Sequence, residues 1–353
     1  MAPLINALQK LALPMRMANP SPSDPPFREE YQSLFEESRG ATRLSPILSA
    51  ADECELPLID LSRLSGTGGR ERADCKSEIA RASREWGFFQ AVNHGISREI
   101  LDDMRREQVK AFDQPFKKKS KEAGHLKFSA GCYRWGTPSA TCLRQLSWSE
   151  AFHVPVTDIS SGSNGGSTLS SIMELFARTV SDLSHRIAEV LAEELGHEST
   201  FFLEKCLPST CYLRMNRYPP CPMPSDLFGL MPHTDSDFLT ILHQDEVGGL
   251  QLVKDGKWIA VKPNPDALII NIGDLFQVWS NDVYKSVEHR VVSNPWAERF
   301  STAYFLCPSY DTVITSCSRP AVYREFSFGE YRKQVQLDVK NLGYKIGLPR
   351  FLL

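Results

Sequence analysis

The sequence has no apolar run that approaches the roughly 20 residues of a membrane-spanning helix. It also has no basic cluster interleaved with aromatic residues, and 40 Lys and Arg against 43 Asp and Glu give a formal net charge of -3. Neither a nucleic acid nor an anionic membrane surface is therefore an expected partner. Nine scattered cysteines without a C-x-x-C pair indicate reduced thiols rather than a disulfide framework. No signal-peptide pattern opens the chain, so we expect a cytoplasmic protein. We also expect a monomer.

The 353 residues are 42% hydrophobic, which is enough for a substantial core. Five prolines between residues 14 and 26 indicate a flexible lead-in. The exposed, low-complexity loop at 160–167 is interpreted as an insertion rather than a domain boundary. The expected organisation is a lead-in over 1–50 and a single domain over 51–353, with a helical part at 51–210, a β-rich core at 211–310 and a C-terminal helix at 320–345.

Helix signals are clearest before residue 200. The spacing of apolar residues predicts one helix over 70–86 and a second that begins at the cap Ser97 and runs to about residue 112. Ser171 and Glu174 have the spacing of a capping box, which would begin a long helix that ends at Gly196. The three lysines at 117–119 are interpreted as a solvated helix end.

His233, Asp235 and His289 are the most informative residues. Residues i and i+2 of a β-strand point to the same side, so His233 and Asp235 can both face one ion. His289 lies in another strand-like run, which would bring it close in space. Two imidazoles and one carboxylate hold the metal of non-haem Fe(II) oxygenases and leave coordination positions open. A single H-x-D triplet is weak evidence, however, and zinc competes for the same three ligands.

Arg299 and Ser301 have the same i, i+2 spacing on an apolar run. They would place a guanidinium and a hydroxyl on one face of a buried strand. A buried arginine needs an anionic partner, because an unpaired buried charge is costly. A bound dicarboxylate would supply that partner, since its carboxylate matches the planar fork of arginine. A hydrolytic zinc enzyme would have no use for such a clamp.

The pattern after residue 210 consists of short β-runs separated by turns such as Asp255-Gly256. Many short strands imply a sandwich or barrel, and a metal at its mouth favours a cupin-like jelly roll. The predicted fold class is therefore α+β, with a double-stranded β-helix core of the jelly-roll type and flanking N-terminal and C-terminal helices.

With these residues in place, the chain resembles the plant 2-oxoglutarate- and Fe(II)-dependent dioxygenases. The resemblance implies Fe(II) held by His233, Asp235 and His289, 2-oxoglutarate as cosubstrate and ascorbate as an activator. It further implies that Arg299 and Ser301 hold the far carboxylate of 2-oxoglutarate, with Tyr218 and Asn216 beside it, although Tyr218 could equally be a packed aromatic. Further matching segments are residues 56–61, 86–89, 92–96, 216–221, 248–252 and 271–274.

Residues 132–141 and 145–153 resemble a narrower group, the gibberellin 2-oxidases that act on C20 gibberellins. These enzymes inactivate a diterpenoid acid by 2-hydroxylation with O2. Tyr133, Arg134 and Trp135 could contact such a substrate, or they could be ordinary core aromatics and a surface charge. The alternatives are another plant oxygenase, with a flavonoid or alkaloid substrate, and a cupin-fold binding protein without catalysis.

Overall fold

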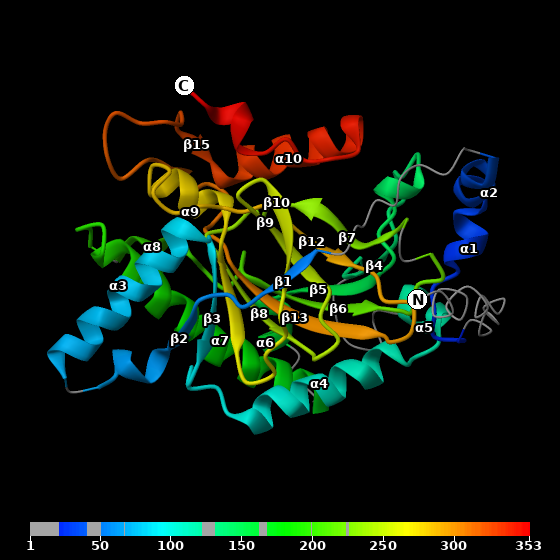
Figure 1. The fold of residues 1–353 in the computed structure, drawn as a ribbon, viewed down its shortest axis with the longest axis horizontal. Helices are drawn as coiled ribbons and strands as arrows, with labels where there is room; N and C mark the ends of the chain where they lie inside the picture. Colours follow the sequence, from blue (N-terminus) through cyan, green and yellow to red (C-terminus); the bar gives the residue numbers. More distant parts are fainter. Residues whose placement is uncertain are drawn as a thin grey trace, which may run out of the picture.

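The computed structural model describes residues 21–40, 51–66, 68–121, 131–161, 168–198, 200–223 and 226–353. Two β-sheets pack face to face between helices, which is the jelly-roll core with flanking helices that the sequence predicts (Figure 1). Within the described residues, no helix is long and apolar enough to cross a membrane.

The larger sheet has eight strands in the order β2-β3-β11-β8-β13-β6-β5-β4. The smaller main sheet has five, in the order β1-β10-β9-β12-β7, and β14 pairs with β15 separately. The strands are β1 Asp52–Cys54, β2 Leu58–Asp60, β3 Phe88–Val92, β4 Tyr133–Trp135, β5 Glu150–Pro155, β6 Tyr212–Tyr218, β7 Phe228–His233, β8 Leu239–Gln244, β9 Leu250–Lys254, β10 Lys257–Val261, β11 Leu268–Ile272, β12 His289–Val292, β13 Arg299–Leu306, β14 Val313–Ile314 and β15 Phe326–Ser327.

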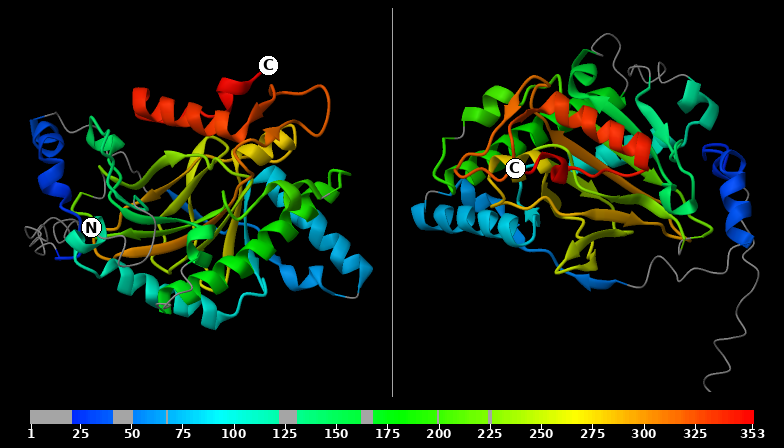
Figure 2. Two further views of the ribbon diagram at one scale, coloured as in Figure 1. Left: turned by 180° about the vertical axis from the view of Figure 1, so that it is seen from behind. Right: turned by 90° about the horizontal axis from the view of Figure 1, so that it is seen from above.

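Helices flank both sides of the sheets. Helices α4 and α7 lie along one side, and α10 lies along the opposite side (Figures 1 and 2). The α-helices are α1 Phe27–Glu30, α2 Gln32–Gly40, α3 Gly69–Glu85, α4 Arg98–Phe112, α5 Phe116–Lys121, α6 Val156–Ser161, α7 Thr168–Glu193, α8 Thr200–Lys205, α9 Asp274–Trp279 and α10 Phe328–Leu342, with 3-10 helices at Leu61–Leu64, Leu143–Gln145 and Leu348–Phe351.

The helices expected at 70–86 and from Ser97 to residue 112 are confirmed as α3 and α4. The hydroxyl of Ser97 accepts a hydrogen bond from the backbone amide of Ile100, as expected of a cap. The C-terminal helix is confirmed as α10. The capping box is wrong, because α7 begins at Thr168 and Ser171 lies inside its first turn. The apolar stripe of α7 packs on the large sheet at β8 and β13, so tertiary packing stabilises this helix whatever its cap.

The segment expected to be mainly helical, 51–210, also contributes strands to the large sheet. Strands β4 and β5 extend it beyond β6, with His153 opposite Arg214 and Ala151 between Arg134 and Asn216. The run at Glu150–Pro155 carries few β-branched residues, so its strand signal is weak. These two strands position the substrate candidates of the sequence analysis.

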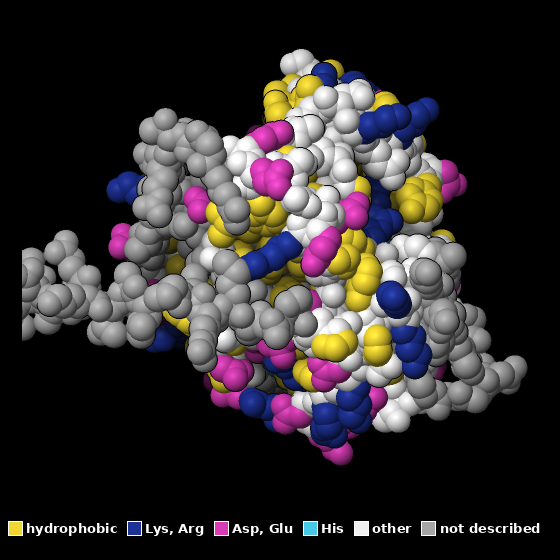
Figure 3. Space-filling view, turned by 90° about the vertical axis from the view of Figure 1, so that its right-hand side faces the viewer, with side chains coloured by type: hydrophobic (Ala, Val, Ile, Leu, Met, Phe, Trp, Pro, Cys, Tyr) yellow, Lys and Arg dark blue, Asp and Glu magenta, His cyan; other side chains and the backbone are white. Residues whose placement is uncertain are grey.

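Residues 21–40, expected within a flexible lead-in, instead form two helices against the chain around residues 135–148. Phe27 stacks on Trp148 at 4.3 Å between ring centroids, and Tyr31 packs beside Trp135. Figure 3 views the side of the molecule that bears α1 and α2, where hydrophobic side chains lie in patches between charged ones. The aromatic residues of this segment, rather than its prolines, determine its structure.

A buried ion cluster lies beneath this segment and corrects the interpretation of one of the three lysines, whereas Lys117 and Lys118 are exposed as expected. Lys119 is completely buried and pairs with Glu150 at 2.6 Å, so it is not a solvated helix end. Arg217 of β6 pairs with Glu150 at 2.7 Å, and it reaches both Asp24 and Glu298 at 2.9 Å. The cluster therefore joins the N-terminal helices to the large sheet.

Candidate metal centre and cosubstrate pocket

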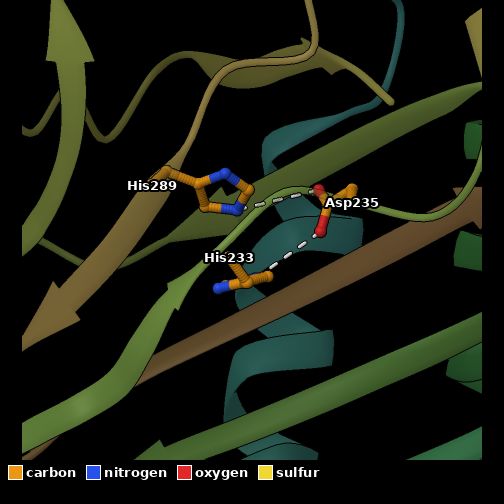
Figure 4. Close-up of side chains that lie close together, drawn as sticks. All are labelled: His233, Asp235 and His289. Carbon is orange, nitrogen blue, oxygen red and sulfur yellow. Dashed lines mark ion pairs between the residues drawn. The ribbon is translucent and has the colours of Figure 1, made fainter. Parts of the chain in front are cut away.

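His233 and His289 face each other across the pair formed by β7 and β12. Asp235 reaches toward both rings, as Figure 4 shows, with 3.6 Å from its Oδ1 to Nε2 of His233 and 3.8 Å from its Oδ2 to Nε2 of His289. Among the described residues, these three are the one group of His, Cys, Asp or Glu side chains positioned to hold a metal ion.

The prediction that His233 and Asp235 share a strand is only half correct. His233 is the last residue of β7, but Asp235 lies in the loop that follows. Hydrogen bonds replace the strand as the means of orienting this carboxylate: its Oδ2 accepts from Thr240 at 2.7 Å and from Asn271 at 2.8 Å. Asn271 lies on β11, so a third element fixes the carboxylate against the two histidines.

Backbone carbonyls orient both imidazoles. Nδ1 of His233 lies 2.7 Å from the carbonyl of Met231, and Nδ1 of His289 lies 3.1 Å from the carbonyl of Val287. A carbonyl only accepts, so each Nδ1 carries the proton and each Nε2 keeps a free lone pair, on the side where Asp235 also lies, for a metal ion. Burial and the neighbouring His289 also hold the pKa of His233 well below its usual range, which keeps this ring neutral, as a metal ligand must be.

Only one carboxylate of the His233–Asp237 stretch suits a metal. Burial alone would raise the pKa of Asp235, but the two histidines and the hydrogen bonds from Thr240 and Asn271 hold it below its ordinary value. Burial and the neighbouring Asp235 raise the pKa of Asp237 well above its usual range, which favours the neutral form of this carboxyl. Asp235 is therefore the ionised member of the pair.

A cavity of about 180 Å³ opens beside these ligands, and Arg299 and Ser301 of β13 line it. Arg299 is 2% exposed, donates to Gln244 at 2.8 Å and lies 4.8 Å from the ring centroid of Tyr218. Its Nε has no partner, and no carboxylate of the described residues forms an ion pair with it. A buried guanidinium in this state fits an anionic ligand that enters the cavity.

Tyr218 and Asn216 line the same cavity from β6. Asn216 donates to the hydroxyl of Ser301 at 3.3 Å, and the Tyr218 ring fills the space over Gly229, where an added Cβ would lie 2.8 Å from the ring. The antiparallel register places Tyr218 opposite Arg299 and Asn216 opposite Ser301. All four residues expected around the cosubstrate therefore come together, at one end of the cavity that the metal ligands share.

Comparison with known proteins agrees with this arrangement. The family model of the 2OG-Fe(II) oxygenase superfamily matches residues 209–308, and that of the N-terminal domain of the non-haem dioxygenases of morphine synthesis matches residues 56–167. The chain belongs to the 2OG-Fe(II) oxygenase superfamily. This oxygenase therefore uses Fe(II) and 2-oxoglutarate, and the residues gathered here fit both.

The oxygenase is 62% identical to gibberellin 2-beta-dioxygenase 8 of Arabidopsis thaliana, over 93% of this chain and 98% of that protein. It is 50% identical to gibberellin 2-beta-dioxygenase 6 of Oryza sativa subsp. japonica, over 93% and 96%. Among solved structures, JOX2 in complex with 2OG, Fe and JA is 32% identical with a TM-score of 0.72, covering 95% of this chain and all of that one.

The three substrate candidates lie on β4, where alternation separates them. Arg134 is level with Ala151 and Asn216, so it shares the cavity face of the sheet, but it is exposed at the sheet edge. Tyr133 and Trp135 point to the opposite face. There Tyr133 donates to Glu150, and Trp135 packs edge-on against Phe27. Consecutive residues of one strand cannot all face one pocket, so the structure does not bring these three together at the cavity.

Lys345, which sequence reasoning missed, secures the loop between His233 and Asp235. Its ammonium group donates to the carbonyl of Thr234 and to the hydroxyl of Ser236, both at 2.9 Å, and pairs with Asp274 at 2.5 Å. Asp274 also accepts from the hydroxyls of Thr234 and Tyr331. The segment after α10 is thus attached to the metal-ligand loop, a contact over 109 residues that no local signal reveals.

Proposed function

We propose that this oxygenase is a gibberellin 2-beta-dioxygenase that inactivates C20 gibberellins by 2-hydroxylation. Four proteins named gibberellin 2-beta-dioxygenase are 42–62% identical to it, each over at least 93% of this chain and 96% of its own length. This near-complete coverage carries the proposal, because it extends beyond the metal site to the segments that surround the cavity.

In this proposal, His233, Asp235 and His289 hold Fe(II). Arg299 and Ser301 bind the far carboxylate of 2-oxoglutarate, and the geometry supports this role because both line the cavity and Nε of Arg299 has no hydrogen-bond partner. The bound metal and cosubstrate supply the oxidation of an unactivated C–H bond, with succinate and CO2 as the other products. The chain itself supplies orientation and a cavity shielded from bulk water.

Asn216 and Tyr218 act around the clamp rather than on the metal. Asn216 orients the Ser301 hydroxyl, while the Tyr218 ring covers the guanidinium of Arg299. Gln108 of α4 donates to the backbone carbonyls of both Asn216 and Ser301, at 3.1 and 2.9 Å, and so secures the two strands from behind. We expect this support to keep the clamp in place when 2-oxoglutarate is absent.

We also propose that the protein is a monomeric cytoplasmic enzyme whose substrate is a diterpenoid acid, and that residues 51–353 form one catalytic domain. The contacts of α1 and α2 with the chain near residues 135–148 support including residues 21–40 in the same folded unit. Size-exclusion chromatography with light scattering tests the monomer, and a second species at twice the mass would contradict it.

Incubation of the protein with Fe(II), ascorbate, 2-oxoglutarate and a panel of C19 and C20 gibberellins tests the function. Mass spectrometry should detect a gain of one oxygen atom in C20 gibberellins together with stoichiometric succinate. The His233→Ala variant is the control for adventitious iron chemistry. Succinate formed without any oxidised gibberellin in the panel would refute the substrate class while leaving the cofactor assignment intact.

A further inference from the structure

Two further arginines, which lie outside the proposed metal ligands and cosubstrate clamp, line the cavity. Arg214 lies on β6, and Arg332 reaches the cavity from α10. Neither forms an ion pair with a carboxylate of the described residues. Half-buried guanidinium groups that face a cavity without a counter-charge are a suitable site for an anion.

The sheet register separates this pair from the 2-oxoglutarate clamp. Arg299 is level with Tyr218, whereas Arg214 is level with Ala303 on one side and His153 on the other. Arg214 and Tyr218 are four residues apart on β6, which is roughly 13 Å along a strand. Both side chains face the cavity, so Arg214 presents positive charge at a position along the cavity that is separate from the 2-oxoglutarate clamp.

An aromatic wall lies beside Arg214 and Arg332. The Tyr212 ring is stacked between Phe305, at 4.4 Å between centroids and 13° between planes, and His153, at 3.9 Å and 18°. Tyr212 is also a hydrogen-bond partner of Arg332. Burial and the nearby Arg214 lower the pKa of His153 to about 3, so this ring is neutral at physiological pH and adds apolar surface rather than charge.

We infer that Arg214 and Arg332 bind a carboxylate of the organic substrate, while Phe305 and Tyr212, the two residues of the aromatic wall that line the cavity, support its hydrocarbon skeleton. This inference rests on the proposed function, since gibberellins are carboxylic acids with an apolar ring system. Arginine presents two parallel N–H donors to a carboxylate, and two guanidinium groups can hold one carboxylate from both sides. The substrate is therefore selected by its charge at one end and by its shape along the aromatic wall.

Equilibrium dialysis of a C20 gibberellin and of its methyl ester tests this inference. The protein is loaded with Fe(II) and 2-oxoglutarate without oxygen, so that binding is measured apart from turnover. The wild type should bind the acid more tightly than the ester. Arg214→Met and Arg332→Met should each weaken binding of the acid by about 10- to 100-fold, the usual value of a charged hydrogen bond, and leave the ester unchanged.

Lys333→Met is the matched control, because it removes a cation from the next, exposed position of α10. It should retain the preference for the acid. The affinity for 2-oxoglutarate should also stay at the wild-type value in both arginine variants, which separates them from variants of Arg299.

Arginine variants that keep the preference for the acid would overturn the inference. An equal loss of affinity for the acid and the ester would also overturn it, because it would indicate that the substitution altered the shape of the cavity. A loss of 2-oxoglutarate binding instead would reassign the pair to the cosubstrate. A wild-type protein that binds neither gibberellin nor ester would refute the proposed function, and this outcome is distinct from the other three.

Discussion

Replacing Arg299 with Met should strongly weaken 2-oxoglutarate binding without unfolding the protein. The guanidinium is 2% exposed and has no carboxylate partner among the described residues, so in the free enzyme it carries its desolvation cost uncompensated. Loss of one partner of a buried ion pair costs about 3–5 kcal/mol, so the Kd for 2-oxoglutarate should rise by about 10² to 10^3.5-fold. The free energy of unfolding without 2-oxoglutarate should change little, because the removed charge offsets the lost hydrogen bond to Gln244, a term of about 1–3 kcal/mol.

Anaerobic calorimetry of 2-oxoglutarate binding and urea unfolding of the free protein measure the two effects. Arg299→Lys should recover only part of the affinity, because an ammonium group cannot make two parallel hydrogen bonds to a carboxylate. Arg217→Met removes an equally buried arginine from a neighbouring strand and is the matched control. Unchanged 2-oxoglutarate affinity in Arg299→Met, or a large loss of stability without 2-oxoglutarate, would refute this reasoning.

Three other perturbations probe different parts of the molecule. His233→Ala should lose Fe(II) binding, measured by competition with a coloured chelator, while its far-UV spectrum stays unchanged; tight iron binding would contradict the proposed ligand set. Lys345→Met should weaken Fe(II) binding several-fold, because the loop around Thr234 loses its restraint, and it should leave 2-oxoglutarate affinity in the iron-loaded enzyme unchanged. Arg217→Met should lower the free energy of unfolding by about 3–5 kcal/mol, because Glu150 loses a buried partner; urea unfolding measures this, and a loss below about 1 kcal/mol would show that the cluster is not stabilising.

Local sequence patterns predict a β-rich core after residue 210 and most of its strands, and they single out the three candidate metal ligands that the structure brings together. In a strand, residues two positions apart share a face. This rule correctly predicts that Arg299 and Ser301 face the same side of β13. The same rule, applied to Tyr133, Arg134 and Trp135, shows that these three cannot share a face once the segment is known to be a strand. The sequence does not predict strand β4, because three residues are too few for an alternating pattern.

Other features depend on contacts that no local pattern reports. The period of two in β6 could have indicated Arg214, since it alternates with Tyr212 and Asn216 on the cavity face. Arg332 could not be found in this way, because its role depends on where α10 crosses the sheets. Hydrogen bonds from Thr240 and Asn271, rather than a strand, orient Asp235. The two-residue spacing therefore predicts that Asp235 lies near His233, but it does not predict what holds Asp235 there.

Arg217 and Arg299 show how charge pairing distinguishes an arginine that stabilises the fold from one that is available to bind a ligand. Arg217 and Arg299 lie in adjacent strands, and both side chains are at least 94% buried. Arg217 faces away from the cavity and pairs with three carboxylates, so its charge is neutralised whether or not a ligand is bound. Arg299 faces the cavity and has no carboxylate of the described residues within ion-pair distance, so an incoming anion can pair with it directly. The same criterion applied to Arg214 and Arg332 supports the proposal that these two residues bind a second anion, the substrate, apart from the cosubstrate at Arg299.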